Sequence, residues 1–181
     1  LIIKFKTMKK LYFLLALISL NAFSQGSINF DDGAKWTQGN LAFTSYSNHS
    51  YADGTFSLAC TDVVRNGIAA QDGFVGGFGT FSLRLQNDAT TDVTMTIASG
   101  GVGNFTFKAR RWDSTPATDY TVEYSTDGGS NWTLSSAING TITTDSDWKT
   151  ITGVINSSNT NIKIRVKGNS AGERLIIDDF S

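Results

Sequence analysis

The sequence predicts an all-β protein, built as an antiparallel two-sheet β-sandwich. Short runs of alternating apolar and polar residues recur about every ten residues and are separated by Gly, Asn, Asp and Ser, a pattern typical of sandwiches and barrels. No long window shows the 3.6-residue period of an amphipathic helix. The 181-residue chain is rich in Thr, Ser, Gly, Asn and aromatic residues and has a single Pro, a composition that disfavours helices and suits strands and tight turns.

The alternation places the clearest strand candidates. They are Ser27 to Phe30, Gly79 to Leu85, Val93 to Ala98, Asn104 to Trp112, Tyr120 to Ser125, Trp132 to Ser136, Lys149 to Ile155, Asn161 to Val166 and Arg174 to Phe180. The segment from Trp36 to Gly79 is less regular, so we expect long loops carrying short strands there. Loops on a rigid sandwich often carry binding residues.

Alternation also assigns each strand an inward and an outward face. Between residues 104 and 112, Phe105, Phe107 and Ala109 point one way, while Lys108 and Arg110 point the other. The candidate strands near residues 83, 122 and 164 repeat the pattern. An inward apolar set and an outward polar set is what two packed antiparallel sheets require.

The N-terminal residues are predicted not to belong to the fold. Lys9 and Lys10 precede an apolar run from Leu11 to Leu20, and residues 22–24 give the small-x-small pattern that signal peptidase recognises. Residues 8–24 are therefore predicted to be a cleaved signal peptide, and residues 1–7 a non-native upstream extension. The apolar run is too short to span a bilayer, which needs roughly 20 residues.

The remaining residues, 25–181, are predicted to form a single domain that is long enough to bury a core without disulfides. Cys60 is the only cysteine and is expected to behave as a buried small hydrophobe. Removing the leader leaves 11 Lys and Arg against 16 Asp and Glu, a net charge of −5, whereas a generic nucleic-acid binder is basic. We therefore expect a monomer outside the cell or on its surface, with no nucleic-acid partner and no membrane span. Whether further domains follow Ser181 is left open.

One turn is marked by its spacing. Residues 125–132 read STDGGSNW, which fits S-x-D-x-G-x-x-W and resembles the Asp-box of sialidases and other secreted β proteins. The resemblance implies a hairpin turn in which the Asp127 side chain caps loop amides, the glycines supply positive φ and Trp132 packs beneath. Such a turn indicates structure rather than catalysis.

The two ends of the domain mirror each other in sequence. Residues 30–33 read FDDG and residues 176–180 read IIDDF. This pair resembles the ends of MAM-like and other jelly-roll modules, of the concanavalin-like or galactose-binding-like kind appended to secreted bacterial polysaccharide-degrading enzymes and nucleases. The resemblance implies a jelly roll whose first and last strands run side by side. MAM domains normally contain several cysteines and this chain has only Cys60, so the likeness covers the ends and the overall pattern.

The same resemblance implies a calcium site. In many such modules a structural Ca²⁺ lies where these strands meet, held by carboxylates and backbone carbonyls. The positions carried over are Asp31, Asp32, Asp178 and Asp179. The alternative is that these acids cap turns, because four carboxylates brought together need countercharge.

Outward residues of several predicted strands gather much of the positive charge of the domain. If their strands share a sheet, the face is a basic, aromatic-edged surface where Arg and Lys contact sulfate or carboxylate groups of a glycan and Trp112 stacks on a sugar ring. The alternative is a solvated face with cross-strand pairs such as Glu123 with Arg110. The predicted ligand-binding residues are Arg84, Lys108, Arg110, Trp112, Glu123, Lys163, Arg165 and Lys167.

Groups of residues suited to catalysis are sparse. His49 is the only histidine, so a Ser-His-Asp triad and a His-based zinc or iron site both lack residues, and His49 is expected to be a polar loop residue. The glycines between residues 73 and 79 precede a strand rather than open a helix, so they do not form a phosphate-binding loop. A carboxylate pair for glycoside hydrolysis stays open, but nothing marks a particular pair.

These inferences predict a secreted, non-catalytic module that binds a polysaccharide or cell-surface glycan, with Ca²⁺ bracing its termini. The glycan would bind to the outward sheet face or to the loops between residues 36 and 79. Two alternatives stay open: an accessory domain of a truncated extracellular hydrolase or nuclease, and a protein-adhesion module of the MAM-like kind.

Overall fold

The computed structural model describes residues 26–37, 43–66, 78–112, 118–135, 140–142, 148–168 and 174–181. Within these residues the chain forms an 11-stranded sheet and one three-residue 3₁₀ helix. The elements are η1 (Gly33–Lys35), β1 (Phe43–Asp53), β2 (Phe56–Asn66), β3 (Ser82–Leu85), β4 (Asp92–Ile97), β5 (Val102–Arg111), β6 (Thr118–Ser125), β7 (Thr133–Leu134), β8 (Gly140–Ile142), β9 (Lys149–Ser157), β10 (Ile162–Gly168) and β11 (Leu175–Asp178). No helix among the described residues is long and apolar enough to cross a membrane.

The predicted leader and extension, residues 1–24, lie outside the described residues.

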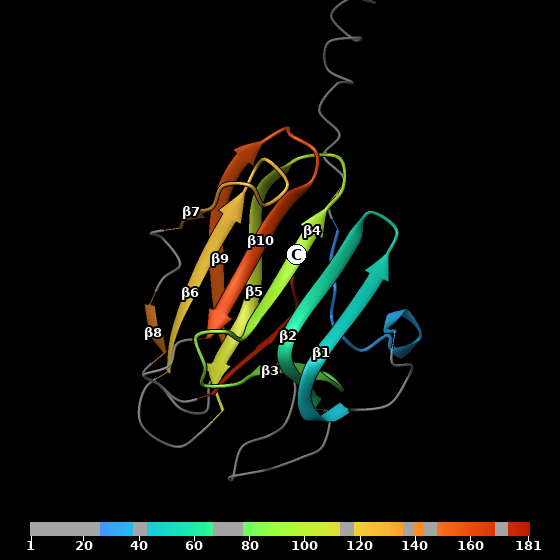
Figure 1. The fold of residues 1–181 in the computed structure, drawn as a ribbon, viewed down its shortest axis with the longest axis vertical. Coiled ribbons are helices and arrows are strands. Elements are labelled where there is room, and N and C mark those ends of the chain that lie inside the picture. The colour runs from blue at the N-terminus through green and yellow to red at the C-terminus, as the bar shows by residue number, and fades with distance from the viewer. Residues whose placement is uncertain are drawn as a thin grey trace, which may run out of the picture.

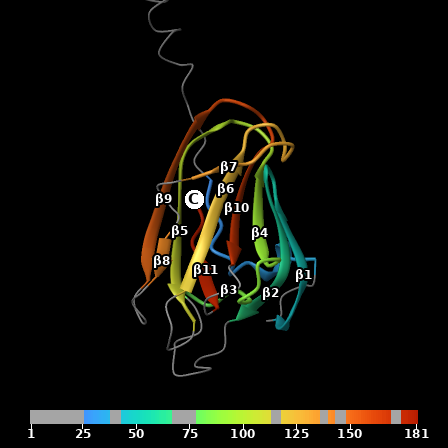
Figure 2. The same cartoon turned by 60° about the vertical axis from the view of Figure 1, so that its left-hand side comes forward.

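The strands form two layers that share β2 (Figures 1 and 2). The first part of β2 pairs with β4, and the part after Asp62 pairs with β3. Asp62 has a φ of +51°, a left-handed conformation that bends a strand. One layer therefore contains β6, β10, β4 and β2, with β1 on its edge, and the other contains β3, β11, β5 and β9. The predicted all-β antiparallel sandwich is confirmed.

The inward faces of the two layers form one hydrophobic core. Met95 and Ile97 of β4 face Phe105 of β5 across the space between the layers, and Leu83 and Ile177 extend the same cluster. All five side chains are buried. Removing an apolar side chain of this size from water contributes about 1.5–3 kcal/mol, so the alternation seen in the sequence is the main determinant of the fold.

The two ends of the domain lie side by side. Ile28 and Phe180 exchange backbone hydrogen bonds of 2.7 and 2.9 Å. The Phe180 ring stacks on both Phe105 and Phe107, with centroids 5.8 and 5.7 Å apart. The last segment is thus anchored in the core and holds the first segment beside it, as the mirrored ends of the sequence imply.

The expectation of long loops with short strands between residues 36 and 79 is wrong for residues 43–66. They form a hairpin of two 11-residue strands, β1 and β2, joined at Gly54. The β1 strand is polar, and its register with β2 shifts twice between Phe43 and His49, which breaks the period of two. A polar, bulged edge strand carries little alternation for sequence analysis to detect.

Candidate ligand-binding site

The predicted ligand-binding residues do not lie on one face. Strands β3 and β5 lie in one layer and strands β6 and β10 in the other, so their outward faces point away from each other. The single basic surface expected from the sequence is therefore divided. Arg84, Lys108, Arg110 and Trp112 belong to β3 and to β5 with its end, while Glu123, Lys163, Arg165 and Lys167 belong to β6 and β10.

The outward face of β6 and β10 carries a charged cross-strand ladder. Arg165 lies directly opposite Glu123 and donates to its Oε2 from Nε at 3.0 Å and from Nη2 at 2.5 Å. The guanidinium also lies 3.9 Å from the centroid of the Trp132 ring. Glu123 thus pairs with Arg165 rather than with Arg110, and this face matches the solvated alternative.

Trp132 belongs to the turn marked by the S-x-D-x-G-x-x-W spacing. Asp127 accepts hydrogen bonds from the Asn131 amide at 2.9 Å and from the Asn131 side chain at 2.7 Å, and these lower the pKa of the Asp127 carboxyl. Gly128 and Gly129 have φ values of +75° and +100°, which glycine adopts without strain. The turn joins β6 to β7 and positions Trp132 over Arg165, while the resemblance to the Asp-box stays a prediction.

The outward face of β3, β11 and β5 brings two arginines onto one row. Ile176 of β11 lies opposite Arg84 on one side and opposite Arg110 on the other. The two arginines are therefore two strand spacings apart, about 10 Å. Asp178 lies opposite Lys108 in the next outward row. Two cations and one isoleucine thus form the floor of this face.

Aromatic rings cover these arginines, a group we call the arginine–aromatic cluster: Tyr46, Arg84, Arg110, Trp112 and Trp148. The Arg84 guanidinium lies 4.5 Å from the Trp112 ring centroid and 5.4 Å from that of Tyr46. The Arg110 guanidinium lies 5.2 Å from Trp148 and 6.0 Å from Trp112. These are cation–π distances, and burial lowers the pKa of Arg110.

Three residues of the arginine–aromatic cluster are buried, although the sequence predicted that they lie on an exposed surface. Arg84 is 4% exposed, Arg110 2% and Trp112 0%. Their outward direction follows the alternation, but the outward side of this layer is covered. The aromatic partners Tyr46 and Trp148 were not among the predicted site residues. The register shifts of β1 interrupt the alternation around Tyr46, and Trp148 lies just before β9 begins.

The cluster has an exposed edge, formed by Phe78, Lys108, Trp148 and Thr150. Phe78 is 40% exposed and meets the Trp148 ring edge to face at 5.7 Å. Lys108 Nζ lies 5.6 Å from the Phe78 centroid and donates to Thr150 Oγ1 at 2.8 Å. An isolated aromatic residue among glycines or charged residues, as Phe78 and Trp148 are, is the sequence signal that could have identified this edge.

Trp112 Nε1 and the Tyr46 hydroxyl are among the polar atoms of the cluster that are buried without a hydrogen-bond partner in the described part of the chain. A buried polar group without a partner costs about 1–3 kcal/mol, so such groups are normally satisfied by water or by a ligand.

Asp31 and Asp32, two of the four carboxylates predicted to bind calcium, engage protein donors. The Asp31 carboxylate accepts from the amides of Thr80 and Phe81 at 3.1 and 2.7 Å. Asp32 accepts from the Ala34 amide at 3.1 Å and so caps η1. Both interactions are of the turn-capping kind that the sequence left open.

The other two predicted calcium ligands are adjacent at the end of β11. Asp178 is fully buried and accepts from the Ser82 hydroxyl and from the Asp179 amide. Burial raises its pKa to about 7. Among the described residues no group of three His, Cys, Asp or Glu side chains is arranged to hold a metal ion. Calcium binding stays a prediction.

His49 and Cys60 both lie in the first hairpin. His49 is in β1 and 7% exposed, so the expected polar loop position is wrong, and its Nε2 lies 2.8 Å from Ser47 Oγ. Burial lowers the His49 pKa. Cys60 is buried, as predicted, and burial raises the pKa of its thiol. A buried protonated thiol is a poor nucleophile.

The fold and this covered cationic face define a small antiparallel β-sandwich with a candidate binding surface. No protein-family model and no curated protein matches the sequence. Solved structures do resemble it. The CBM22-1–GH10 modules of Clostridium thermocellum endo-1,4-β-D-xylanase 10B, complexed with xylohexaose, match with 15% identity and a TM-score of 0.50, over 70% of this chain and 25% of that chain.

Two further structures are similar over most of their length. The CBM22-1 xylan-binding domain of Paenibacillus barcinonensis Xyn10C has 15% identity and a TM-score of 0.49, covering 86% of this chain and 90% of that one. The K2 cleaved adhesin domain of Lys-gingipain has 12% identity and a TM-score of 0.48, covering 84% and 92%. At these identities the likeness bears on the fold alone, which is an all-β sandwich.

Proposed function

We propose that this chain is a secreted, non-catalytic module that binds a glycan at the exposed edge of the arginine–aromatic cluster. The observation that carries the proposal is the pair of rings, Phe78 and Trp148, that meet edge to face beside Lys108. The Trp148 ring lies against the Arg110 guanidinium, which helps to fix its position. Rings fixed in this way offer apolar contact without losing much side-chain freedom on binding.

The chemistry of the edge suits a sugar. The apolar face of a pyranose can lie on the Phe78 or Trp148 ring, while its hydroxyls hydrogen-bond to Lys108 and Thr150. Arg84 and Arg110, which we predicted to touch the glycan, instead position the aromatic rings.

The remaining parts of the proposal rest on the sequence. The predicted leader supports secretion to the cell exterior or surface. A binding role is supported by the sequence, in which no recognisable catalytic motif was found. The similar CBM22-1–GH10 modules are complexed with xylohexaose, which makes polysaccharides the first ligands to test. The proposal includes a structural Ca²⁺ that braces the two ends of the domain and is bound by Asp31, Asp32, Asp178 and Asp179.

A glycan array tests the proposal directly. The full chain would be screened with about 2 mM Ca²⁺, which fills weak extracellular sites, and again with EDTA. Binding to a defined polysaccharide is expected, and a loss of binding in EDTA would support the calcium site. No binding in either condition would reject the glycan proposal.

Two substitutions locate the site. Phe78→Ala and Trp148→Ala are each expected to weaken glycan binding about tenfold or more, because each removes a stacking ring. Leu134→Ala is the matched control, since Leu134 is an exposed apolar residue of β7 in the other layer, 58% exposed. Equal losses in all three variants would show that the binding surface lies elsewhere.

A further inference from the structure

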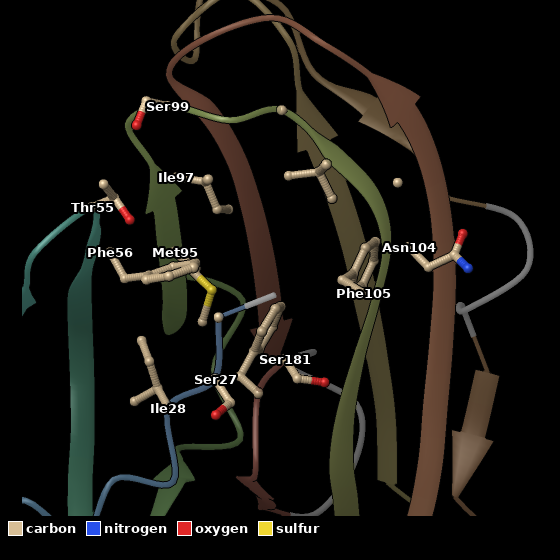
Figure 3. Close-up of a pocket in the computed structure, with 15 residues that line it drawn as sticks. Ser27, Ile28, Thr55, Phe56, Met95, Ile97, Ser99, Asn104, Phe105 and Ser181 are labelled. Carbon is tan, nitrogen blue, oxygen red and sulfur yellow. The ribbon is translucent and has the colours of Figure 1, made fainter. Parts of the chain in front are cut away.

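A cavity of about 360 Å³ opens between the two layers at the end of the sandwich where the first described residues meet the β4–β5 loop. Figure 3 shows Phe56, Met95, Ile97 and Phe105 around it, with Ile28 below. Protein interiors are packed like organic crystals and contain few voids larger than a water molecule. A space of this size, inside the range of small-molecule sites, is not an ordinary packing defect.

Glycine creates part of the space. Gly103 of β5 lines the cavity, and a Cβ added there would meet no heavy atom within 4 Å. Gly101 also lines it but is fixed by the backbone, because a Cβ would lie 2.5 Å from the Ser157 carbonyl oxygen and its φ is +72°. The core therefore ends at Gly103 without a side chain to fill it.

The lining separates into a buried apolar interior and an exposed polar mouth. Met95, Ile97, Phe105 and Phe180 are all at most 6% exposed. The polar lining residues Ser27, Thr55 and Ser99 are exposed. No side chain among the 15 residues that line the cavity carries a charge. A charged group held here would lose hydration without gaining a counter-ion.

We propose that this cavity binds an uncharged amphiphile, with an alkyl body in the interior and a hydroxyl or ether head at the mouth. An apolar cavity of about 150 Å³ is large enough for benzene. The present cavity is more than twice that size, which suits a chain of about eight to twelve carbons. The cavity is separate from the arginine–aromatic cluster, and neither proposal depends on the other.

The test uses alkyl tri(ethylene glycol) ethers from hexyl to tetradecyl, kept below their micelle concentrations. They carry no sugar, so they do not report on the proposed glycan site. The chain has two methionines, and Met95 lines the cavity, so its ¹³C-methyl resonance, assigned by its loss in Met95→Leu, reports occupancy. Affinity is expected to rise about fourfold per methylene and to stop rising once the chain fills the cavity.

Two variants separate cavity binding from surface adsorption. Gly103→Leu adds four carbons inside the cavity and is expected to weaken binding of the octyl ether at least tenfold. Val154→Phe adds four carbons at a 54% exposed position on β9, opposite Asn104, and is expected to leave binding unchanged. Octanoate is expected to bind more weakly than the octyl ether.

Three outcomes would overturn the proposal. They are an unmoved Met95 resonance across the whole series, affinity that climbs with chain length without limit, and equal binding by both variants. The chain-length limit is measured on the unaltered protein, so the proposal stays testable even if Gly103→Leu fails to fold.

Discussion

The two outward faces of the sandwich start from the same sequence pattern and end in different environments. On β6 and β10, Arg165 lies opposite Glu123 and both side chains keep about a quarter of their exposure, 25% and 20%. On β3, β11 and β5, Arg84 and Arg110 lie on either side of Ile176 and are almost fully buried. Alternation predicts which way a side chain points, but not what covers it.

The difference comes from the residue opposite each arginine. An acid directly across the strand pair satisfies the guanidinium at the surface, as Glu123 does. An isoleucine leaves the guanidinium to be satisfied from above, and Trp112, Tyr46 and Trp148 supply ring faces there. The first face is therefore a solvated ladder, whereas the second can organise aromatic rings for binding.

The sharpest test of this comparison is the loss of one tryptophan from each face. Trp112→Ala is expected to lower the free energy of unfolding by about 3–5 kcal/mol, because it removes a fully buried ring and leaves a cavity. Trp132→Ala, which removes the partly exposed ring over Arg165, is expected to cost about 1 kcal/mol. Urea unfolding gives both values. Similar losses would mean that the two faces are equally buried in solution.

Asp178 makes the covered face sensitive to pH. The pKa of Asp178 is about 7 in the folded protein, above its ordinary value of 3.8. Between pH 3.8 and pH 7 the carboxyl group is therefore protonated in the folded state and ionised in the unfolded state. The contribution of Asp178 to stability should then be largest below pH 4 and be lost as pH rises through 7, by at most about 1.4 kcal/mol per pH unit.

Asp178→Asn tests this dependence, since an amide does not titrate. The variant is expected to lack the decline between pH 4 and 7 that the unaltered chain shows in urea unfolding. Asp127→Asn serves as the control. Its carboxyl pKa is lowered by hydrogen bonds, so its contribution to stability has the opposite sign and is lost only as pH falls. A wild-type stability that is flat from pH 4 to 7 would contradict the burial of a protonated Asp178.

The strands with strict alternation are the ones that sequence analysis places well. The prediction of a strand over Asn161 to Val166 matches β10 at Ile162–Gly168, because Ile162, Ile164 and Val166 all enter the core. Strand β1 is not predicted, because its few inward residues include His49. A polar side chain that packs inward reverses the pattern on which the prediction depends.

The candidate site is less predictable than the fold for a related reason. Lys108 and Arg110 follow from the alternation of β5, but Phe78 and Trp148 lie outside the strands, where no period assigns a direction. Their meeting depends on the order β3-β11-β5-β9, which places distant segments side by side. The sequence identifies the cations of the face and Trp112, whereas the aromatic residues Tyr46, Phe78 and Trp148 are found only from the structure.

The smallest expected effect is on the solvated ladder. Glu123→Gln removes the acid opposite Arg165, yet the pair is partly exposed, so we expect a loss of about 0.5–1 kcal/mol at low salt. The loss should shrink further in 1 M NaCl, where the Debye length is about 3 Å. Lys163→Gln, which removes a charge of β10 that lies opposite Ser125 rather than Glu123, is the control for loss of a charge outside the Glu123–Arg165 pair. A loss of several kcal/mol that salt does not change would mean that the ladder is as desolvated as the arginine–aromatic cluster. The residue opposite each arginine would then not explain the difference between the two faces.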